Sequence, residues 1–247
     1  MAPISIDGEE ITGATIDGEE VQEITVDGQV AYTAGPDIPD SGLMHQYEAD
    51  NLSKSDGDSV STWPDQEGTD DLTAGNAPTY RTDEINGKPA VSYDFSDYLS
   101  VSFSTISTPI QHFLVAKLDS TSENNTLLYD GGSNFQNGVG YDSGSWFITD
   151  DDTNFITGGN ANTNWNLWDA RATFADHELS IDSSVVLNAP DGGVDQTGLT
   201  HTARSGRSAS NNDADARIAA HLIYDASASG FSESDVRDYL NDKYGPL

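Results

Sequence analysis

The sequence predicts an all-β protein in which a small module of repeated β-hairpins precedes a jelly-roll β-sandwich with a carboxyl-terminal helix. Three observations lead to this fold class. Asp-Gly turns recur near the amino terminus, short stretches of alternating apolar and polar residues fill the rest of the chain, and one amphipathic helical pattern closes it. Such a chain is expected to bury its core between two packed sheets.

Residues 1–35 carry a ten-residue repeat built on Asp-Gly dipeptides. Each dipeptide follows a β-branched residue, in the triplets Ile6-Asp7-Gly8, Ile16-Asp17-Gly18 and Val26-Asp27-Gly28. Asp-Gly in this setting favours a two-residue hairpin turn, because both central residues of that turn need a positive φ. Hairpins this short cannot bury a core alone. We therefore predict an attachment or oligomerisation module; the alternative is an extra β-meander packed on the main domain.

A linker and a larger domain follow the repeats. Residues 36–41 are rich in Pro and Asp and are expected to form the linker. Residues 42–247 are long enough to form one sandwich with its own core. Alternating stretches bounded by turn residues predict strands at residues 90–95, 99–103, 112–118, 146–148, 170–174, 177–181 and 218–224.

The final element is a helix over residues 232–244. Ser232 and Asp235 have the spacing of a capping box. One face of the predicted helix collects Val236, Tyr239, Leu240 and Lys243/Tyr244, and Gly245-Pro246 ends it. We expect this face to pack on the sandwich.

Charge restricts the classes of function. The chain has 42 acidic and 10 basic residues, for a net charge of −32, and the acids are interspersed with 4 Trp, 10 Tyr and 8 Phe. This composition favours a folded protein of a halophile, because molar salt shortens the Debye length to about 3 Å and screens the repulsion. The alternative is an acidic secreted β-protein or a calcium binder. Nucleic-acid binding is excluded because it needs a basic surface.

The lack of cysteine and of targeting segments bears on where the protein is located. The chain contains no cysteine, which excludes disulfides and thiolate metal sites. It has no apolar run that predicts membrane insertion and no signal peptide at its start. We expect export by another route, such as assembly into a particle inside the cell followed by release.

Residues 42–247 resemble the concanavalin A-like lectin/glucanase superfamily, in its laminin-G-like form. The motifs that carry the likeness are WPDQEG at 63–68, NAPTY at 76–80, NGKPAVSYD at 86–94, DYL at 97–99, NWNLW at 164–168, IAAHLIYD at 218–225 and the final segment 231–245. The family's "lYvdG" hairpin is degraded here at residues 179–184. The resemblance implies a jelly-roll sandwich with Trp63, Trp165 and Trp168 in structural positions.

The amino-terminal repeats resemble a segment of structural proteins from tailed viruses of haloarchaea. That resemblance implies a virion protein and agrees with the acidic composition and the missing signal peptide.

Catalysis is not expected. The glucanase branch of the family uses a Glu-x-Asp-x-x-Glu strand, which places three carboxylates on one face. The nearest string here, residues 178–182, lacks the internal Asp and the third acid, and no Gly-x-Ser-x-Gly elbow occurs. His112 and His221 lie inside strand patterns and are predicted to be core or edge residues rather than metal ligands.

Glycan binding in such sandwiches uses aromatic platforms with Asn or Asp nearby. Loops 134–141 and 150–164 are rich in Gly, Asn and aromatic residues, which suits adaptable recognition. The candidate residues are Phe135, Asn137, Tyr141, Phe155, Asn160 and Asn162; the alternative is that these loops are ordinary hairpin turns. No cofactor is required, but calcium is a candidate ligand of Asp150, Asp151 and Asp152, because hard cations bind carboxylate oxygens. The alternative there is a solvated halophilic loop.

The leading hypothesis is a non-enzymatic surface protein of a haloarchaeal virus, in a head turret or spike, a head decoration or a tail fibre. Residues 1–35 would bind other virion proteins and form a homo-oligomer. The lectin-like sandwich would bind a host cell-surface glycan or glycoprotein in a high-salt extracellular setting, with avidity compensating for weak single contacts. The alternatives are a purely structural capsid-stabilising protein and a cellular halophilic carbohydrate-binding module.

Overall fold

A computed structural model divides the chain into two compact units, Met1–Ile38 and Pro39–Leu247. In the first unit, the structure describes the short strands given below and residues 37–38. In the second, the structure describes all residues except 95, 122–124, 130–137, 143, 150–154, 174, 190–195 and 202–214. The boundary between the units falls inside the segment 36–41 that the sequence analysis assigned to a linker.

The first unit contains three antiparallel hairpins. Their strands are β1 (Ser5–Ile6) with β2 (Glu9–Glu10), β3 (Thr15–Ile16) with β4 (Glu19–Glu20), and β5 (Glu23–Val26) with β6 (Gln29–Thr33). The pairs nearest the turns are Ile6 with Glu9, Ile16 with Glu19 and Val26 with Gln29. Each pair therefore encloses one Asp-Gly dipeptide, as predicted. The dipeptides themselves lie outside the described residues.

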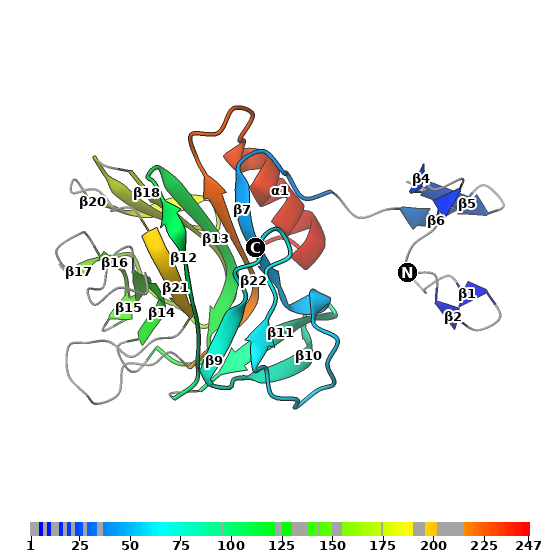
Figure 1. Cartoon of the computed structure of the whole chain (residues 1–247), viewed down its shortest axis with the longest axis horizontal. Helices are drawn as coiled ribbons and strands as arrows, with labels where there is room; N and C mark the ends of the chain where they lie inside the picture. Colours follow the sequence, from blue (N-terminus) through cyan, green and yellow to red (C-terminus); the bar gives the residue numbers. More distant parts are fainter. Residues whose placement is uncertain are drawn as a thin grey trace. The chain divides into compact units, whose positions relative to one another are not determined.

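The second unit is a β-sandwich, which confirms the predicted fold class. In the described part of this unit, each of two sheets has eight strands (Figure 1). The first sheet has the order β10 (Thr79–Ile85), β11 (Lys88–Tyr93), β22 (Ala216–Asp225), β13 (Ile110–Leu118), β18 (Trp165–Ala172), β19 (His177–Ile181) and β20 (Ser184–Ala189), with β7 (Leu43–Glu48) also paired to β22. The second has the order β17 (Phe155–Gly158), β16 (Ser145–Thr149), β15 (Val139–Asp142), β14 (Asn125–Tyr129), β21 (Gln196–His201), β12 (Tyr98–Ile106), β9 (Leu72–Asn76) and β8 (Thr62–Trp63).

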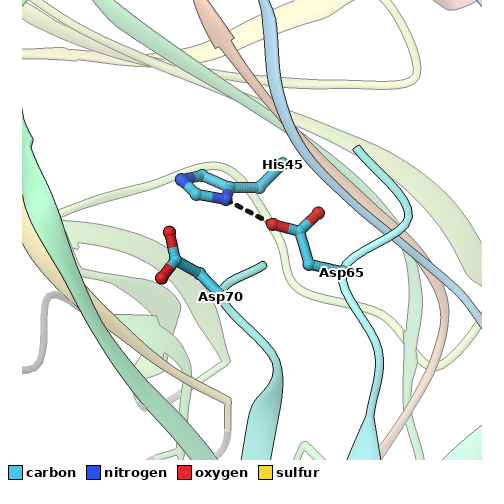
Figure 2. A group of neighbouring side chains, drawn as sticks. All are labelled: His45, Asp65 and Asp70. Atoms are coloured by element: carbon cyan, nitrogen blue, oxygen red, sulfur yellow. Dashed lines mark hydrogen bonds and ion pairs between the residues drawn. The ribbon is translucent and has the colours of Figure 1, made fainter. Parts of the chain in front are cut away.

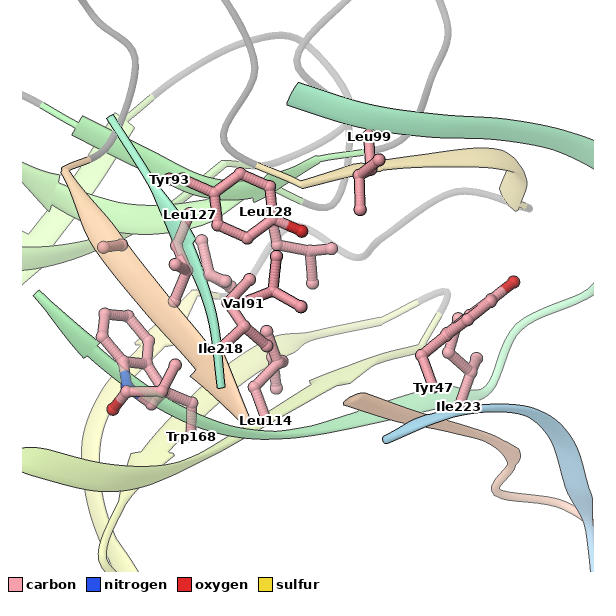
Figure 3. Packing of buried hydrophobic residues seen from close by; sticks show 14 of the residues in the cluster. Tyr47, Val91, Tyr93, Leu99, Leu114, Leu127, Leu128, Trp168, Ile218 and Ile223 are labelled. Atoms are coloured by element: carbon pink, nitrogen blue, oxygen red, sulfur yellow. The ribbon is translucent and has the colours of Figure 1, made fainter. Parts of the chain in front are cut away.

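The core lies between the two sheets. Figure 3 shows Leu114 and Ile218 of the first sheet and Leu99 and Leu128 of the second directed into the same interior. Trp146 and Trp168 meet edge to face, with ring centroids 4.6 Å apart. Such aromatic pairs add about 0.5–1.5 kcal/mol beyond the area that they bury.

The predicted strands agree with the structure in position. All seven stretches fall in strands, but β11 ends at Tyr93 and β18 at Ala172, each before the predicted end. The degraded hairpin at 179–184 still forms, because Asp182 and Ser183 both adopt a positive φ and join Ile181 to Ser184. Trp63 and Trp168 are fully buried, as predicted. Trp165 is half-buried, and its Nε1 donates to the Glu84 carbonyl at 3.1 Å.

Helix α1 (Glu233–Tyr244) confirms the carboxyl-terminal prediction. Ser232 caps it by accepting a hydrogen bond from the Asp235 N–H at 3.4 Å. The buried residues of the helix are Val236, Tyr239, Leu240 and Tyr244. The helix packs on the outer face of the first sheet, where the Tyr244 hydroxyl donates to the Ala219 carbonyl of β22 (Figure 1). None of the described helices is long and apolar enough to cross a membrane.

Candidate functional site

A row of buried rings runs along the inner side of β7. Tyr47 lies between His45 and His221, with centroid distances of 6.3 Å to each. His112 Nδ1 is 3.0 Å from His221 Nε2. His112 and His221 were predicted to be core or edge residues of strands; both lie in strands, β13 and β22, and both are buried.

At one end of this row, His45 meets two aspartates. His45 comes from β7, whereas Asp65 and Asp70 come from the loop between β8 and β9 (Figure 2). One ligand atom from each of the three side chains lies within 4.8 Å of the other two. A nitrogen and two carboxylates are a donor set that transition metals accept, so the group is a candidate metal centre.

The Asp65 carboxylate is already occupied by hydrogen bonds. Its Oδ2 is 2.8 Å from His45 Nδ1, and its Oδ1 accepts from the backbone N–H groups of Gln46 (3.0 Å) and Glu67 (3.2 Å). Burial alone would raise the pKa of Asp65. The hydrogen bonds from His45, from the Gln46 N–H and from the Gly68 N–H outweigh burial and lower the pKa below its ordinary value of 3.8.

This protonation state decides what the cluster can do. An ionised carboxylate only accepts hydrogen bonds, so His45 Nδ1 must carry the proton. Nδ1 therefore has no lone pair for a metal ion. A metal ion could bind at Nδ1 only if the His45–Asp65 hydrogen bond broke. The geometry instead fits an anchor that fixes the loop 64–71 to β7.

Sequence reasoning missed this cluster because its members come from separate segments. One signal existed: Asp65 is the acid of the WPDQEG motif, which the family resemblance singled out. Nothing in the local pattern around His45 indicated that it would face that turn.

The predicted glycan-binding residues do not form one group in the described structure. Tyr141 must be removed from the set. It lies on β15, is fully buried and belongs to the hydrophobic core, so it cannot stack on a sugar. Phe155 begins β17, and Phe135 and Asn137 lie outside the described residues, as do Asp150, Asp151 and Asp152 of the proposed calcium loop.

The two asparagines of that set differ in exposure. Asn160 is exposed. Asn162 is half-buried, and its Oδ1 accepts from the Asn164 N–H at 2.8 Å and from Asn166 Nδ2 at 3.1 Å. Asn162 therefore shapes its own loop, and Asn160 alone of the pair has an exposed side chain.

The acid string at residues 178–182 is divided by a strand end. Glu178 lies on β19 and accepts from Asn188 Nδ2 at 3.3 Å. Asp182 lies in the following turn, where its Oδ1 accepts from the Leu167 N–H at 2.8 Å. Both carboxylates thus have structural partners.

Two buried charge networks lie beneath helix α1. Asp169 on β18 is 3% exposed, and it accepts hydrogen bonds from Gln111 Nε2 at 2.6 Å and from Arg237 Nε at 2.9 Å. Burial raises the pKa of Asp169 to about 6 despite these partners.

The second network centres on Glu48, which is 1% exposed. It accepts from the Tyr239 hydroxyl at 2.9 Å and pairs with Lys243 Nζ at 3.0 Å. Lys243 also lies 3.1 Å from Asp50. Together the two networks join the helix to β7, β13 and β18.

No family model and no curated protein matches the chain in sequence. Solved structures match its fold. The sialidase of Trypanosoma rangeli in complex with sialic acid has a TM-score of 0.58 and 12% identity, over 90% of this chain and 36% of that one. Domain 4 of the GH43 extracellular arabinanase from Geobacillus stearothermophilus, in complex with arabinotriose, has a TM-score of 0.52 and 12% identity, over 81% and 98%.

A structure of botulinum neurotoxin type C, whose cell entry depends on interaction with two ganglioside molecules, has a TM-score of 0.55 and 10% identity, over 82% of this chain and 52% of that one. The chain spans only about a third of the length of the sialidases that it matches. At these identities the likeness establishes the fold, a β-sandwich of the kind found in these proteins and consistent with a concanavalin A-like jelly roll.

Proposed function

We propose that this chain is a non-catalytic glycan-binding protein whose sandwich recognises a saccharide. One observation carries the proposal: the sandwich matches 98% of the arabinanase domain that was solved in complex with arabinotriose. The matched sialidase is in complex with sialic acid, and cell entry of the matched neurotoxin depends on interaction with gangliosides. Because one fold hosts many functions, a binding experiment tests this proposal.

The hydrogen-bonding partners of the most buried described carboxylates argue against a catalytic role for them. A glycosidase needs an acid and a second carboxylate free to act on the scissile bond. Asp65, Asp169 and Glu48, the most enclosed candidates, are each engaged by two or more hydrogen-bonding partners. We therefore propose binding without turnover.

We further propose that the protein is displayed on the surface of a haloarchaeal virus, in a turret or spike, a head decoration or a tail fibre. The support is the net charge of −32 and the three amino-terminal hairpins. Residues 1–35 would attach it to other virion proteins and make it a homo-oligomer. A calcium ion at Asp150, Asp151 and Asp152 is part of this proposal. Nucleic acid and membrane are not expected partners.

The test is binding of the full-length chain to a glycan array and to purified haloarchaeal envelopes in about 3 M KCl, where repulsion between surface charges is screened beyond about 3 Å. A fragment of residues 39–247, which contains every described residue of the hydrophobic core, runs in parallel. We expect saturable binding by both, stronger for the full-length chain because repeated copies add avidity. No binding by either, with oligomers intact by light scattering, would leave a purely structural capsid protein.

The halophilic part of the proposal has its own test. Thermal melting followed from about 0.1 M to about 3 M KCl should show a steady rise in Tm, because salt screens the repulsion among the acids. A Tm that is independent of salt would favour an ordinary acidic β-protein.

A further inference from the structure

Within the part of the second sheet whose side chains the structure describes, the outer face carries an exposed aromatic side chain, Tyr98, at the start of β12. Leu99 points into the core and is fully buried, so its neighbours Tyr98 and Ser100 point outward. Tyr98 is 36% exposed. Among the described residues, Tyr98 and Val185 are the two large hydrophobic residues that are exposed.

A β-bulge in the neighbouring strand makes room for the Tyr98 ring. Leu99 pairs with Ala74 and Tyr98 pairs with Asn76, which leaves Gly75 as the extra residue of β9. A Cβ atom on Gly75 would lie 1.8 Å from Cζ of Tyr98. The ring therefore rests directly on the Gly75 backbone, and only glycine allows that position.

Polar groups surround the ring. Asn76 is exposed, and its Nδ2 donates to Asp97 Oδ1 at 2.9 Å and to Ser96 Oγ at 3.0 Å. These bonds fix the amide while its carbonyl oxygen accepts no hydrogen bond within the described part of the chain. Thr73, which pairs with Ser100, adds a hydroxyl on the same outer face.

We propose that Tyr98, held on Gly75 and flanked by Asn76, is a stacking platform for a neutral saccharide ring. This inference rests on the proposed glycan-binding function and assigns its site. A sugar ring presents C–H groups on its face and hydroxyls at its edge, which match an aromatic face beside amide and hydroxyl groups. The platform lies outside loops 134–141 and 150–164, which were predicted to bind glycans.

Charge near the platform selects against acidic sugars. Asp97 bonds to Asn76, and Asp94 is exposed in the adjacent turn, where its carboxylate accepts from Ser96. A sugar carboxylate bound on the Tyr98 ring would approach both aspartates, and like charges at short range repel. The site therefore favours neutral saccharides over sialylated ones.

Three substitutions test the platform on the full-length chain. Tyr98→Ala removes the ring, and we expect at least a tenfold loss of binding to the best neutral oligosaccharide of an array that includes arabinotriose. Gly75→Ala keeps the ring but displaces it. Because the atoms that clash are the far end of a side chain, Gly75→Ala should fold normally and lose binding several-fold. Tyr98→Trp should retain binding.

The control is Val185→Ala, which removes the other exposed hydrophobic side chain and should leave binding unchanged. Binding by wild type that survives Tyr98→Ala overturns the platform and leaves the proposed function standing. Absence of any bound saccharide in the wild type overturns both. A preference for sialylated members of matched glycan pairs overturns the assignment to neutral sugars.

Discussion

The two outer faces of the sandwich differ in whether their polar side chains are buried or exposed. On the face covered by α1, Asp169 and Glu48 are buried, and their carboxylates are paired with Arg237 and Lys243 of the helix. On the open face, near Tyr98, the exposed residues Thr73, Asn76 and Asp94 carry a hydroxyl, an amide and a carboxylate. The covered face buries its paired charges, whereas the open face leaves groups such as the Asn76 carbonyl oxygen accessible to solvent or a ligand. Substitutions on the two faces should therefore separate stability from binding.

The largest expected effect is at Arg237 on the covered face. Arg237→Ala leaves the buried Asp169 carboxylate with Gln111 as its remaining described partner, and breaking such a pair costs about 3–5 kcal/mol of unfolding free energy. Burial raises the pKa of Asp169 to about 6 even beside Arg237, and loss of this cation raises the pKa further. The variant therefore holds an unpaired charge only above that higher pKa, and its deficit in unfolding free energy should shrink as the pH falls toward 6 and the carboxyl takes up a proton. Urea titration at several pH values measures it.

The matched control for that variant is Arg81→Ala. The Arg81–Asp56 pair spans 3.7 Å, and both side chains are largely exposed. Its loss should cost less than about 1 kcal/mol and should not depend on pH near 6. Equal losses for the two arginine variants would contradict the contrast between the faces, as would a loss of saccharide binding by folded Arg237→Ala.

A smaller effect is expected at Asp65, which anchors the loop that leads into β9 of the open face. Asp65→Asn weakens hydrogen bonds to a charged acceptor and should cost about 1.5–3 kcal/mol at neutral pH. The pKa of Asp65 is lower in the folded chain than its ordinary 3.8. The contribution is therefore complete above about pH 4 and is lost as pH falls through the folded pKa.

Stability measured from pH 6 down to pH 2 should thus fall less steeply in Asp65→Asn than in the wild type. Asp70→Asn is the control, because its carboxylate accepts no hydrogen bond among the described residues. A similar acid response in all three proteins would show that Asp65 is not the anchor of this loop.

The comparison of the faces also shows what the sequence could predict. The helix that covers the first sheet could be predicted from the local sequence pattern. Its position at 232–244, its cap and its buried residues all follow from the spacing of apolar and capping residues. The platform at Tyr98 could not be predicted from the sequence, because the need for glycine at position 75 arises only when β9 and β12 pair with a bulge. Tyr141 was wrongly predicted to bind a glycan because Gly and Asn around it indicated a loop. In β15, Tyr141 and Val139 instead alternate inward to the core.

Ser232→Ala tests how much the amino-terminal cap of α1 contributes to stability. An N-cap serine replaced by alanine costs about 1 kcal/mol, because one backbone N–H at the helix start loses its acceptor. Thermal melting should detect a small fall in Tm with unchanged saccharide binding. Ser232→Asp should restore the wild-type Tm, since aspartate caps helices equally well. A failure of Asp to restore it would mean that the cap contributes through something other than this hydrogen bond.

The smallest effect is expected at Val185, and it separates exposure from function. Val185 is 59% exposed on β20, more than Tyr98, yet it is aliphatic and presents no flat ring to a sugar. Val185→Ser should change the unfolding free energy by less than about 0.5 kcal/mol, as substitutions at exposed positions generally do. Saccharide binding, measured on the same array as for Tyr98→Ala, should equal that of the wild type. A loss at Val185 comparable to the loss at Tyr98 would mean that apolar exposure alone governs binding, and that the bulge at Gly75 does not define the site.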